Sequence, residues 1–510
     1  MVVQHNMQAM NANRMLNVTT STQAKATEKL SSGYKINRAA DDAAGLTISE
    51  KMRKQIKGLD RASTNAEDGV SSVQTAEGAL TEVHSMLQRM NELAVQASNG
   101  TNSESDRSAI QDEVNQLTTE IDRVSETTKF NETYLLKGQD GKKTINMNAH
   151  DAGLAGKLVD NGDGTAAFTM DSLKAGDKVS IGGKNYTIGG TDTDVTALID
   201  AANAALKNNT DKFSLKIGDN EFQVVKGKIL DKDGNQLYVA SAANAATPAT
   251  FDAKTSTFTT TASFTSTAAN TPKIDNAALT VDNLKAIASL SGKTTTVGAD
   301  TVTVMTDAKN ADGTQGTDGI DDTDASIITK ENAYKLAANE LAAANKIGDT
   351  EGASSVTNNN DGTFSIKVGQ AKVANALSFS LHVGADADMT NKIEVDIESM
   401  DSASLGIKGL NVKDKTGNAA TYAIDAIADA VAKVSEQRSA LGAVQNRLEH
   451  TIANVDNVVE NTTSAESRIR DTDMAEEMVN YSKNNILAQA GQSMLAQANQ
   501  SNQGVLSLLQ

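Results

Sequence analysis

Residue types that commonly do chemistry in proteins are sparse in this chain of 510 residues. Its histidines do not form the H-E-x-x-H motif, which places two zinc ligands and a general base on one helix. They stand apart, at His5, His84, His150, His382 and His450. Cysteine is absent, which excludes thiolate nucleophiles, thiolate metal ligands and disulfides. Because the nucleophile elbow, the phosphate-binding loop and the dinucleotide fingerprint are also absent, the sequence favours a protein that is not an enzyme.

Two clusters in the middle of the chain offer the oxygen ligands that calcium prefers. They read NGDG at 161–164 and DGTQGTDGIDD at 312–322. Neither completes the D-x-D-x-D-G-x₅-E spacing of a calcium-binding loop. We therefore interpret both clusters as turns, and we expect no metal site and no cofactor.

The charge and the termini limit the classes of partner. A net charge of −18 disfavours nucleic acid, because binding phosphates requires clustered lysine and arginine. The first residues, MVVQHNMQAMNANRML, lack the basic start and apolar run of a secretory signal. No stretch reaches the roughly 20 apolar residues that span a bilayer, so we expect no membrane insertion. Taken alone, these features indicate a cytoplasmic protein, but export without a cleaved signal would give the same pattern.

The pattern of residue types divides the chain into three parts. Residues 1 to about 140 and about 402 to 510 contain no proline and show a helical period. The middle is rich in Thr, Gly, Asp and Asn and resembles a series of short strands.

The first part carries a long apolar seam at steps of three and four residues. This seam predicts one helix over about 45–98, roughly 80 Å long at 1.5 Å per residue, packed in a bundle or coiled coil. Ser63 and Glu77 fill two skipped seam positions. The apolar members are Met52, Ile56, Leu59, Ala66, Val70, Val73, Leu80, Val83, Leu87, Met90, Ala94 and Ala97.

Local signals mark the end of this helix and the start of the next. Asn99-Gly100 predicts a stop in the left-handed conformation. Ser103 and Asp106 resemble a capping box that opens a second helix. The seam of that helix is formed by Ile110, Val114, Leu117, Ile121 and Val124.

Three glycines lie inside the first long helix, at Gly58, Gly69 and Gly78, and each costs up to about 1 kcal/mol against alanine. We interpret them as places where another helix approaches closely, with neutral sequence drift as the alternative.

The third part carries another long seam, interrupted by Arg438. Its members are Ile424, Ile427, Val431, Val434, Leu441, Val444, Leu448, Ile452, Val455 and Val459. Because a stripe this long needs partner helices, we expect it to pack against the two N-terminal helices. Pairing the two ends of the chain makes the middle an insertion that projects from the bundle.

The extreme ends, 1–45 and 465–510, differ from the long seams. Their amphipathic stretches contain methionine and leucine diluted by asparagine and glutamine, so each isolated helix would bury little area. We expect both ends to be poorly ordered in the free subunit and to order on assembly.

The middle carries hairpin signals in which glycine-containing turns stand beside alternating runs. They begin at Asn161, Val179, Ser214 and Asn359. Short helices are predicted near 194–206 and 331–345. The predicted fold is therefore mainly α, with long antiparallel helices in a core and one or two inserted β-rich or α+β outer domains.

Both ends of the chain resemble bacterial flagellin. The N-terminal match is KLSSGYKINRAADDAAGLTISEKMRKQIKGLDRASTNAEDGVSSVQTAEGAL, from Lys29 to Leu80, and it extends through 87–101 and 110–131. The C-terminal match begins with SRIRDTDMAEEMVNYSKNN at Ser467 and runs to the terminal VLSLLQ. The middle shows no such match, as the resemblance implies for a variable, surface-exposed part.

This resemblance implies a domain plan and a function. Residues 1–45 and 465–510 would form the inner filament layer, 46–140 and 402–464 the filament core, and 141–401 the outer domains, two in number. The chain would polymerise into the helical flagellar filament for swimming, and it would be secreted unfolded by type III export to an extracellular flagellum. The implied partners are copies of itself, an export chaperone on the C-terminal helix, the filament cap and the hook-junction proteins.

The resemblance also implies recognition by the animal innate receptor Toll-like receptor 5. Carried over by position, the receptor patch comprises Gln88, Arg89, Leu93 and Glu113. The simpler interpretation is that Arg89 is a solvated helix residue paired with Glu92 or Glu113.

Two other functions fit the same terminal design. A hook–filament junction protein shares the helical ends but forms only a short segment, and the closeness of both terminal matches argues against it. A filament-displayed adhesin would use the middle region to bind its target.

Overall fold

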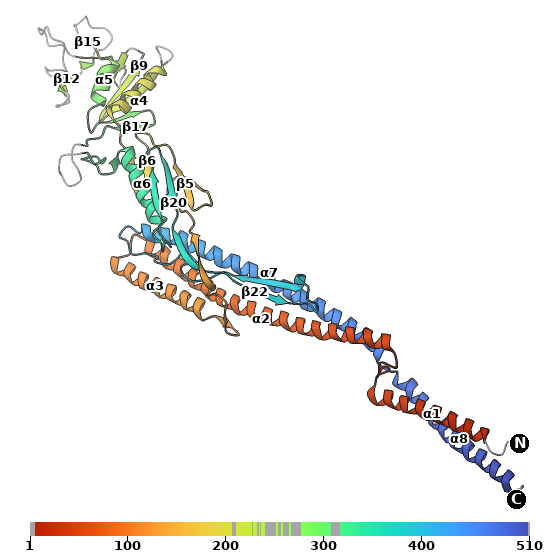
Figure 1. Cartoon of the computed structure of the whole chain (residues 1–510). Coiled ribbons are helices and arrows are strands. Elements are labelled where there is room, and N and C mark those ends of the chain that lie inside the picture. Colours follow the sequence, from red (N-terminus) through yellow and green to blue (C-terminus); the bar gives the residue numbers. More distant parts are fainter. Residues whose placement is uncertain are drawn as a thin grey trace.

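The computed structural model describes residues 6–206, 211–226, 228–231, 234, 236–239, 251–252, 257–258, 265–266, 277–307 and 317–507. Residues 312–316 of the second acidic cluster lie outside this set. The molecule is elongated: paired terminal helices stand at one end, a helical core follows, and two outer domains lie at the other end (Figure 1).

Five helices form the part of the molecule built from the chain ends. They are α1 (Met7–Ser32), α2 (Ala43–Ser98), α3 (Glu104–Thr127), α7 (Asn418–Arg470) and α8 (Met474–Ser507). The long helix α2 packs along α7, α3 lies beside the distal half of α2, and α1 pairs with α8 (Figure 1). The predicted α core with paired chain ends and an inserted, β-rich middle is confirmed.

The predicted seams form the main hydrophobic core. Leu80, Leu87, Val114, Ile427 and Leu441 are fully buried in one cluster that joins α2, α3 and α7. Fully burying such a side chain contributes about 1.5–3 kcal/mol, so the sustained seam stabilises the three-helix core.

The end of α2 differs from the expectation. Asn99 is extended, with φ −69° and ψ 124°, and Gly100 is not left-handed, so the predicted left-handed stop is wrong. The buried Arg107 of α3 supplies the missing donors: its Nε donates to Ala97 O at 3.0 Å and its Nη2 to Asn99 O at 3.2 Å. The capping box of Ser103 and Asp106 at the start of α3 is confirmed.

The three glycines of α2 have different surroundings. A Cβ at Gly69 would lie 2.2 Å from Leu381 Cδ1 and 3.2 Å from Leu448 Cδ1, and one at Gly58 would lie 3.1 Å from Ala385 Cα. Close approach therefore explains these two positions, with a hairpin as the main neighbour instead of a helix. It does not explain Gly78, whose surroundings are open.

This hairpin pairs β22 (Leu377–His382) with β23 (Lys392–Ile397), and a short 3-10 turn, η1 (Met389–Asn391), lies in its loop. Leu377, Val395 and Ile397 belong to the hydrophobic cluster of the core helices. Although the sequence placed this segment in the outer region ending at 401, its packing places it with the core. A small hairpin of β1 (Lys129–Phe130) and β2 (Thr133–Tyr134) follows α3.

The outer domain next to the core is assembled from two separated stretches of chain. Its first stretch contains β3 (Gln139–Asn146), β4 (Gly156–Asp160), β5 (Thr165–Met170), β6 (Lys178–Ile181) and β7 (Lys184–Ile188). Its second contains β18 (Ile327–Ile328), α6 (Lys330–Ala344), β19 (Ser355–Asn358), β20 (Thr363–Lys367) and β21 (Gln370–Asn375). The sheets are ordered β19-β20-β5-β4, β18-β7-β6 and β21-β3.

The same five-residue turn opens both central strands of the four-stranded sheet. In N-x-D-G-T at 161–165 and 359–363, the Asp accepts from the Thr backbone N–H, at 3.0 and 2.8 Å. Antiparallel pairing of β5 with β20 sets Phe168 opposite Phe364. The hairpins predicted at Asn161, Val179 and Asn359 are confirmed. The first of the two oxygen-rich clusters, at 161–164, forms the turn between β4 and β5.

The outermost domain is inserted between β7 and β18. It contains α4 (Asp192–Ala204), β8 (Lys212–Ile217), β9 (Asn220–Val225), β10 (Lys228–Leu230), α5 (Val281–Ala288), β16 (Thr294–Val297) and β17 (Asp300–Thr303). Its main sheet is ordered β10-β9-β8-β16-β17. Shorter strands are β11 (Leu237–Val239), β12 (Phe251–Asp252), β13 (Thr257–Phe258), β14 (Thr265–Ser266) and β15 (Ala277–Ala278).

The helices predicted near 194–206 and 331–345 are confirmed as α4 and α6, and the hairpin predicted at Ser214 as β8–β9. Sequence reasoning missed α5, whose eight residues are too short for a clear period.

Candidate assembly surface and the face around Arg89

The paired helices α1 and α8 expose much of their apolar surface. In α1 only Ala26 is buried, whereas Met7 is 70% and Met10 62% exposed. Met494 of α8 is 63% exposed, and Ile486 is 66% exposed. Large apolar side chains are therefore left exposed along both helices, which is typical of surfaces that associate with a partner.

A groove of 800 Å³ runs between the two helices. Its lining mixes apolar with amide and hydroxyl side chains: Gln8, Asn11, Ala12, Met15, Leu16, Thr19, Leu487, Ala490, Gly491, Met494, Gln497, Ala498 and Ser501. A hydrogen bond from Asn6 Nδ2 to Ala498 O at 3.1 Å joins the two helices at their far end. The sequence prediction that these ends order only on assembly stays a prediction.

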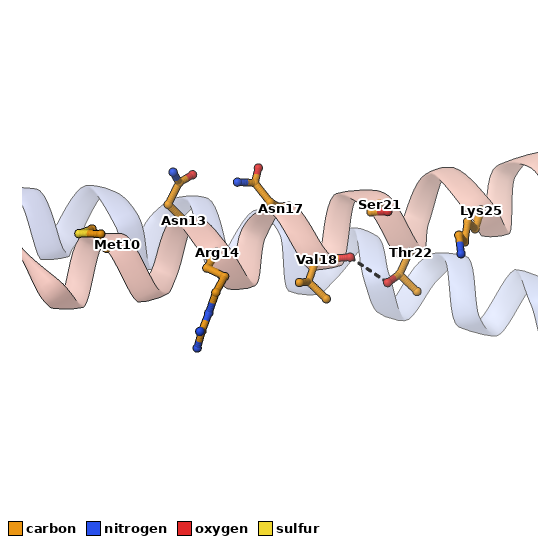
Figure 2. A pocket seen from close by; sticks show the side chains of 8 residues that line it. All are labelled: Met10, Asn13, Arg14, Asn17, Val18, Ser21, Thr22 and Lys25. Carbon is orange, nitrogen blue, oxygen red and sulfur yellow. Dashed lines mark hydrogen bonds between the residues drawn. The ribbon is translucent and has the colours of Figure 1, made fainter.

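A second hollow lies on another face of α1 (Figure 2). Met10 and Val18 give it apolar walls, Arg14 extends away from both helices, and Lys25 stands at its far end. Thr22 Oγ1 donates to Val18 O at 2.8 Å. Because this hydroxyl already has a partner within the helix, it adds little polarity to this face of α1.

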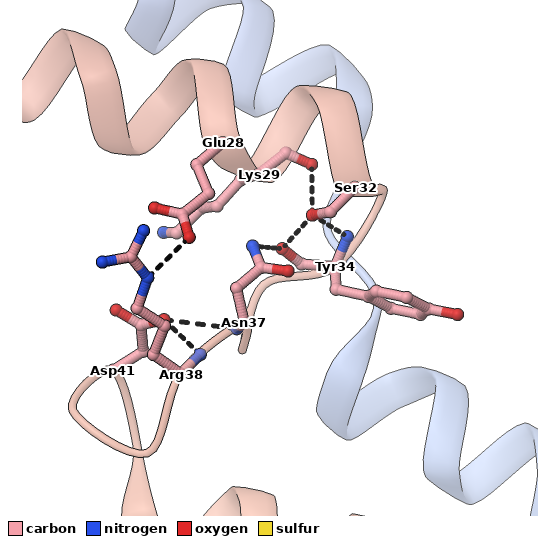
Figure 3. Close-up of polar contacts among 7 residues, drawn as sticks. All are labelled: Glu28, Lys29, Ser32, Tyr34, Asn37, Arg38 and Asp41. Carbon is pink, nitrogen blue, oxygen red and sulfur yellow. Dashed lines mark hydrogen bonds and ion pairs between the residues drawn. The ribbon is translucent and has the colours of Figure 1, made fainter.

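The segment between α1 and α2 is held by a polar network (Figure 3). Gly33 has φ +78°, which ends α1 because glycine accepts the left-handed conformation. Arg38 Nε lies 2.8 Å from Glu28 Oε1, and Asp41 accepts from the backbone N–H groups of Arg38 and Asn37. The hydrogen bond from the Arg38 backbone is the largest cause that lowers the pKa of Asp41.

The two linkers between the terminal pair and the core bind one another. Tyr34 and Asp471 form an antiparallel bridge, and Lys35 N donates to Arg470 O at 2.7 Å. The Arg470 guanidinium lies 4.8 Å from the centre of the Tyr34 ring, within cation–π range. The two linkers therefore form one joined, two-stranded connection between the α1–α8 pair and the α2–α7 pair. No local pattern in the sequence marks this contact between residues more than 400 positions apart.

The proposed receptor residues lie toward one end of the core, and the structure joins two of them, Arg89 and Glu113. Arg89 of α2 donates from Nε to Glu113 of α3 at 2.9 Å and from Nη1 to Glu92 at 3.0 Å. Glu113 is the largest cause that raises the pKa of Arg89. Gln88 is exposed, with its Nε2 3.0 Å from His84 Nε2. Both ion pairs expected from the simpler interpretation therefore form.

Leu93 is placed differently from the other three residues. Only 1% of it is exposed, and it packs in the core cluster with Val114 and Met90. In this arrangement Leu93 supports the surface from beneath and does not reach it.

Across the described residues, no group of three or more His, Cys, Asp or Glu side chains is arranged to hold a metal ion. Within the same part of the chain, no helix is long and apolar enough to cross a membrane.

These features define a class: an elongated subunit whose paired chain ends offer exposed surfaces for assembly, with its outer domains at the opposite end. Two family models match the same chain ends. The bacterial flagellin N-terminal helical region matches residues 3–140, and the bacterial flagellin C-terminal helical region matches residues 424–509.

Full-length relatives extend the match to the middle of the chain. A flagellin of Clostridium tyrobutyricum is 38% identical over 506 residues, covering 99% of this chain and 100% of the relative. A flagellin of Salmonella muenchen is 37% identical over 513 residues, covering 97% and 96%. The chain belongs to the bacterial flagellin family. It is accordingly a structural component of the flagellar filament.

Among solved structures, FliC from Burkholderia pseudomallei is 20% identical, with 74% of this chain and 99% of that chain covered and a TM-score of 0.26. The flagellar hook associated protein-3 of Legionella pneumophila is 12% identical, with 82% and 98% covered and a TM-score of 0.29. Scores this low carry no argument about shape.

Proposed function

We propose that this chain polymerises into the helical filament of a bacterial flagellum used for swimming. The exposed apolar surface of α1 and α8 is the observation that carries the proposal. Burying apolar surface contributes about 25 cal/mol per Å², and copies of the subunit are a suitable partner because the family forms filaments. Identical subunits with non-closing, head-to-tail contacts generate a helix instead of a ring.

The layers follow from the order of the elements along the rod. The α1–α8 pair forms the inner layer, the α2–α3–α7 core surrounds it, and the two outer domains face outward. The full-length match to flagellins favours the filament subunit over the hook–filament junction protein.

The same proposal includes secretion to an extracellular flagellum by type III export. An export chaperone would bind α8, whose exposed apolar residues need protection before assembly. At its two ends the filament would contact the cap and the hook-junction proteins. These partners follow from family membership.

Recognition by Toll-like receptor 5 is a further part of the proposal. The exposed Gln88, Arg89 and Glu113 form a charged and polar surface on the core helices. Arginine is enriched among residues that dominate protein interfaces. The buried Leu93 contributes by supporting Met90 and Val114 beneath this surface.

Electron microscopy of the purified chain under polymerising conditions tests the filament proposal. The intact chain is expected to form long helical filaments. A chain lacking residues 474–510 is expected to remain monomeric, because α1 loses its partner. Circular dichroism should still show a cooperative unfolding transition, since the main core cluster contains no residue of α8. Filaments of normal length from the truncated chain would contradict the proposal.

A further inference from the structure

The apolar surface that α1 and α8 expose consists mainly of methionine. Among the described side chains of these two helices, ten large apolar ones are exposed, and six of the ten are methionines. The other four are Val18, Val479, Ile486 and Leu487. We call the six the terminal methionines: Met7, Met10, Met15, Met474, Met478 and Met494.

Methionines in the rest of the molecule are placed differently. Met90 is fully buried in the core, and Met147, Met170 and Met400 are between 3% and 6% exposed. Met389, in the loop of the β22–β23 hairpin, is the exception and is 74% exposed. A reagent that attacks thioethers from solvent therefore reaches the terminal methionines and Met389 before the methionines that hold the hydrophobic clusters together.

Peroxide is such a reagent, and no thiol competes for it because the chain contains no cysteine. When hydrogen peroxide meets a thioether, the O–O bond breaks, one oxygen bonds to the sulfur, and the other leaves as water. The sulfur loses two electrons and the peroxide gains them. The product is methionine sulfoxide, a polar side chain, which sulfoxide reductases return to methionine.

Oxidation at the terminal methionines changes the surface that assembly must bury. Met15 of α1 and Met494 of α8 both line the groove between the two helices, and Met10 lines the hollow on another face of α1 (Figure 2). A sulfoxide oxygen at these positions is a new hydrogen-bond acceptor. Burying an acceptor without a donor is unfavourable, and each oxidised subunit would bring up to six.

An apolar assembly surface does not by itself require sulfur. Leucine and methionine have similar helix propensities, and exchanging them conserves volume. Leu487 shows that leucine is accepted on the same groove. What methionine adds to these positions is a side chain whose polarity can be changed and restored by oxidation and reduction.

We propose that the terminal methionines are sites of reversible oxidation, and that their conversion to sulfoxides by peroxide prevents a free subunit from joining the filament. This inference rests on the proposed filament function and adds a modification that controls it. A subunit that has already assembled is protected, because its neighbours cover the terminal methionines. Oxidation therefore acts on subunits before they assemble, and reduction restores them.

Treating the full-length monomer with hydrogen peroxide tests the proposal. Peptide mass spectrometry identifies the methionines that gain an oxygen, and the dose is set so that Met90, Met147 and Met400 stay unmodified. Circular dichroism checks that the monomer remains folded. The treated chain should need an about tenfold higher concentration to polymerise, because unpaired acceptors oppose burial. Incubation with the two methionine sulfoxide reductases, one for each epimer, and dithiothreitol should restore polymerisation.

Two variants separate the terminal methionines from Met389. The first replaces all six terminal methionines by leucine and retains Met389; it should polymerise equally well with and without peroxide. The matched control carries Met389→Leu alone, and peroxide should inhibit it as strongly as the original chain. Where the sixfold variant polymerises poorly before treatment, the three substitutions in α1 and the three in α8 are tested separately, and each set should remove part of the inhibition.

Three results would overturn the inference: polymerisation of the oxidised original chain like the untreated one, no recovery after reduction, or equal inhibition of the leucine variants and the Met389→Leu control. Equal rates of oxidation of the terminal methionines in monomers and in preformed filaments would also overturn it, because neighbours would then not cover them. Failure of the untreated original chain to polymerise would instead contradict the proposed filament function.

Discussion

Glu77 of α2 lies opposite Arg438 of α7, with Oε1 and Nη2 3.5 Å apart. Each of these residues interrupts the apolar seam of its own helix, so the two interruptions are one contact. Ser63, the other interruption in α2, donates from Oγ to Asp456 at 3.0 Å. Polar residues in the seams are therefore paired across the interface instead of being isolated defects.

The first prediction is a double-mutant cycle on this pair. Both side chains are about one-third exposed, so solvent screening reduces their coupling to about 0.5–1 kcal/mol. Glu77→Leu alone should destabilise the core because it leaves Arg438 without its partner, whereas Glu77→Leu with Arg438→Leu should be neutral or stabilising. Urea unfolding of the monomer measures both. A destabilised double variant would show that the pair contributes more than a continuous apolar seam.

The second prediction compares two glycines of the same helix. Gly69→Ala should destabilise the core by about 1 kcal/mol, because crowding against Leu381 and Leu448 outweighs the gain in helix propensity. Gly78→Ala should stabilise it by up to about 1 kcal/mol, because its surroundings are open. Thermal unfolding of the monomer distinguishes them; equal effects at the two positions would refute the close approach at Gly69.

The third prediction concerns Asp321, which is 4% exposed in the outer domain next to the core. Burial raises its pKa, but hydrogen bonds from Thr323, Thr306 and Asp324 outweigh that effect, and the pKa is lowered from 3.8. Because the folded pKa is below the unfolded one, its contribution is present above pH 4 and is lost as the pH falls further.

Asp321→Asn should therefore cost about 1–2 kcal/mol at neutral pH and less at pH 3. Hydrogen exchange of β18 and α6 measures the effect. The exposed Asp171→Asn serves as the control. A cost that does not change with pH would exclude the carboxylate as its source.

The fourth prediction tests the receptor surface. Arg89→Ala should weaken binding of the monomer to Toll-like receptor 5 about thirtyfold, as for a buried arginine at the centre of an interface. Its effect on unfolding of the monomer should be small, because both of its ion pairs are exposed. Filament yield is measured in parallel, because we expect the same face of α2 to pack against a neighbouring subunit. Unchanged receptor affinity would leave Arg89 as a solvated helix residue.

The fifth prediction concerns removal of the outer domains. Met147 N donates to Gly369 O at 2.8 Å, so a short Gly/Ser linker can replace 148–368 without separating β3 from β21. This chain should still form filaments. A deletion of 145–395 should instead destabilise the core, because it removes most of the hairpin that packs on α2. Electron microscopy and thermal unfolding compare the two deletions. Equal stability would assign the hairpin to the outer region.

Long-range periodicity made the helical core predictable. Seams sustained over several turns identify α2 and α7 because tertiary packing requires one continuous apolar face. The end of α2 was not predictable from Asn99 and Gly100, since the decisive donor, Arg107, belongs to another helix. The packing of the β22–β23 hairpin on the core helices was not predictable for a similar reason. Alternation of apolar and polar residues shows that one face of a strand is buried, but it does not show which element covers that face.

The candidate site was predictable only in part. The contact of Arg89 with Glu113 could be anticipated from the sequence, whereas the burial of Leu93 depends on how α3 packs over α2. The receptor patch itself stays a prediction. The bridge of Tyr34 with Asp471 had no local signature, because its partners meet only after the two ends of the chain pair.

At three levels the chain leaves a part of the fold and returns beside its point of departure: Tyr34 with Asp471, Met147 with Gly369, and Gly190 with Val304. The molecule is thus organised like nested parentheses. Each enclosed unit can change in length or sequence while the gap that it must bridge stays fixed. The sequence of the outermost domain can therefore diverge while the residues in the interior of the polymer stay the same. A foreign domain with adjacent termini could replace it at the same positions.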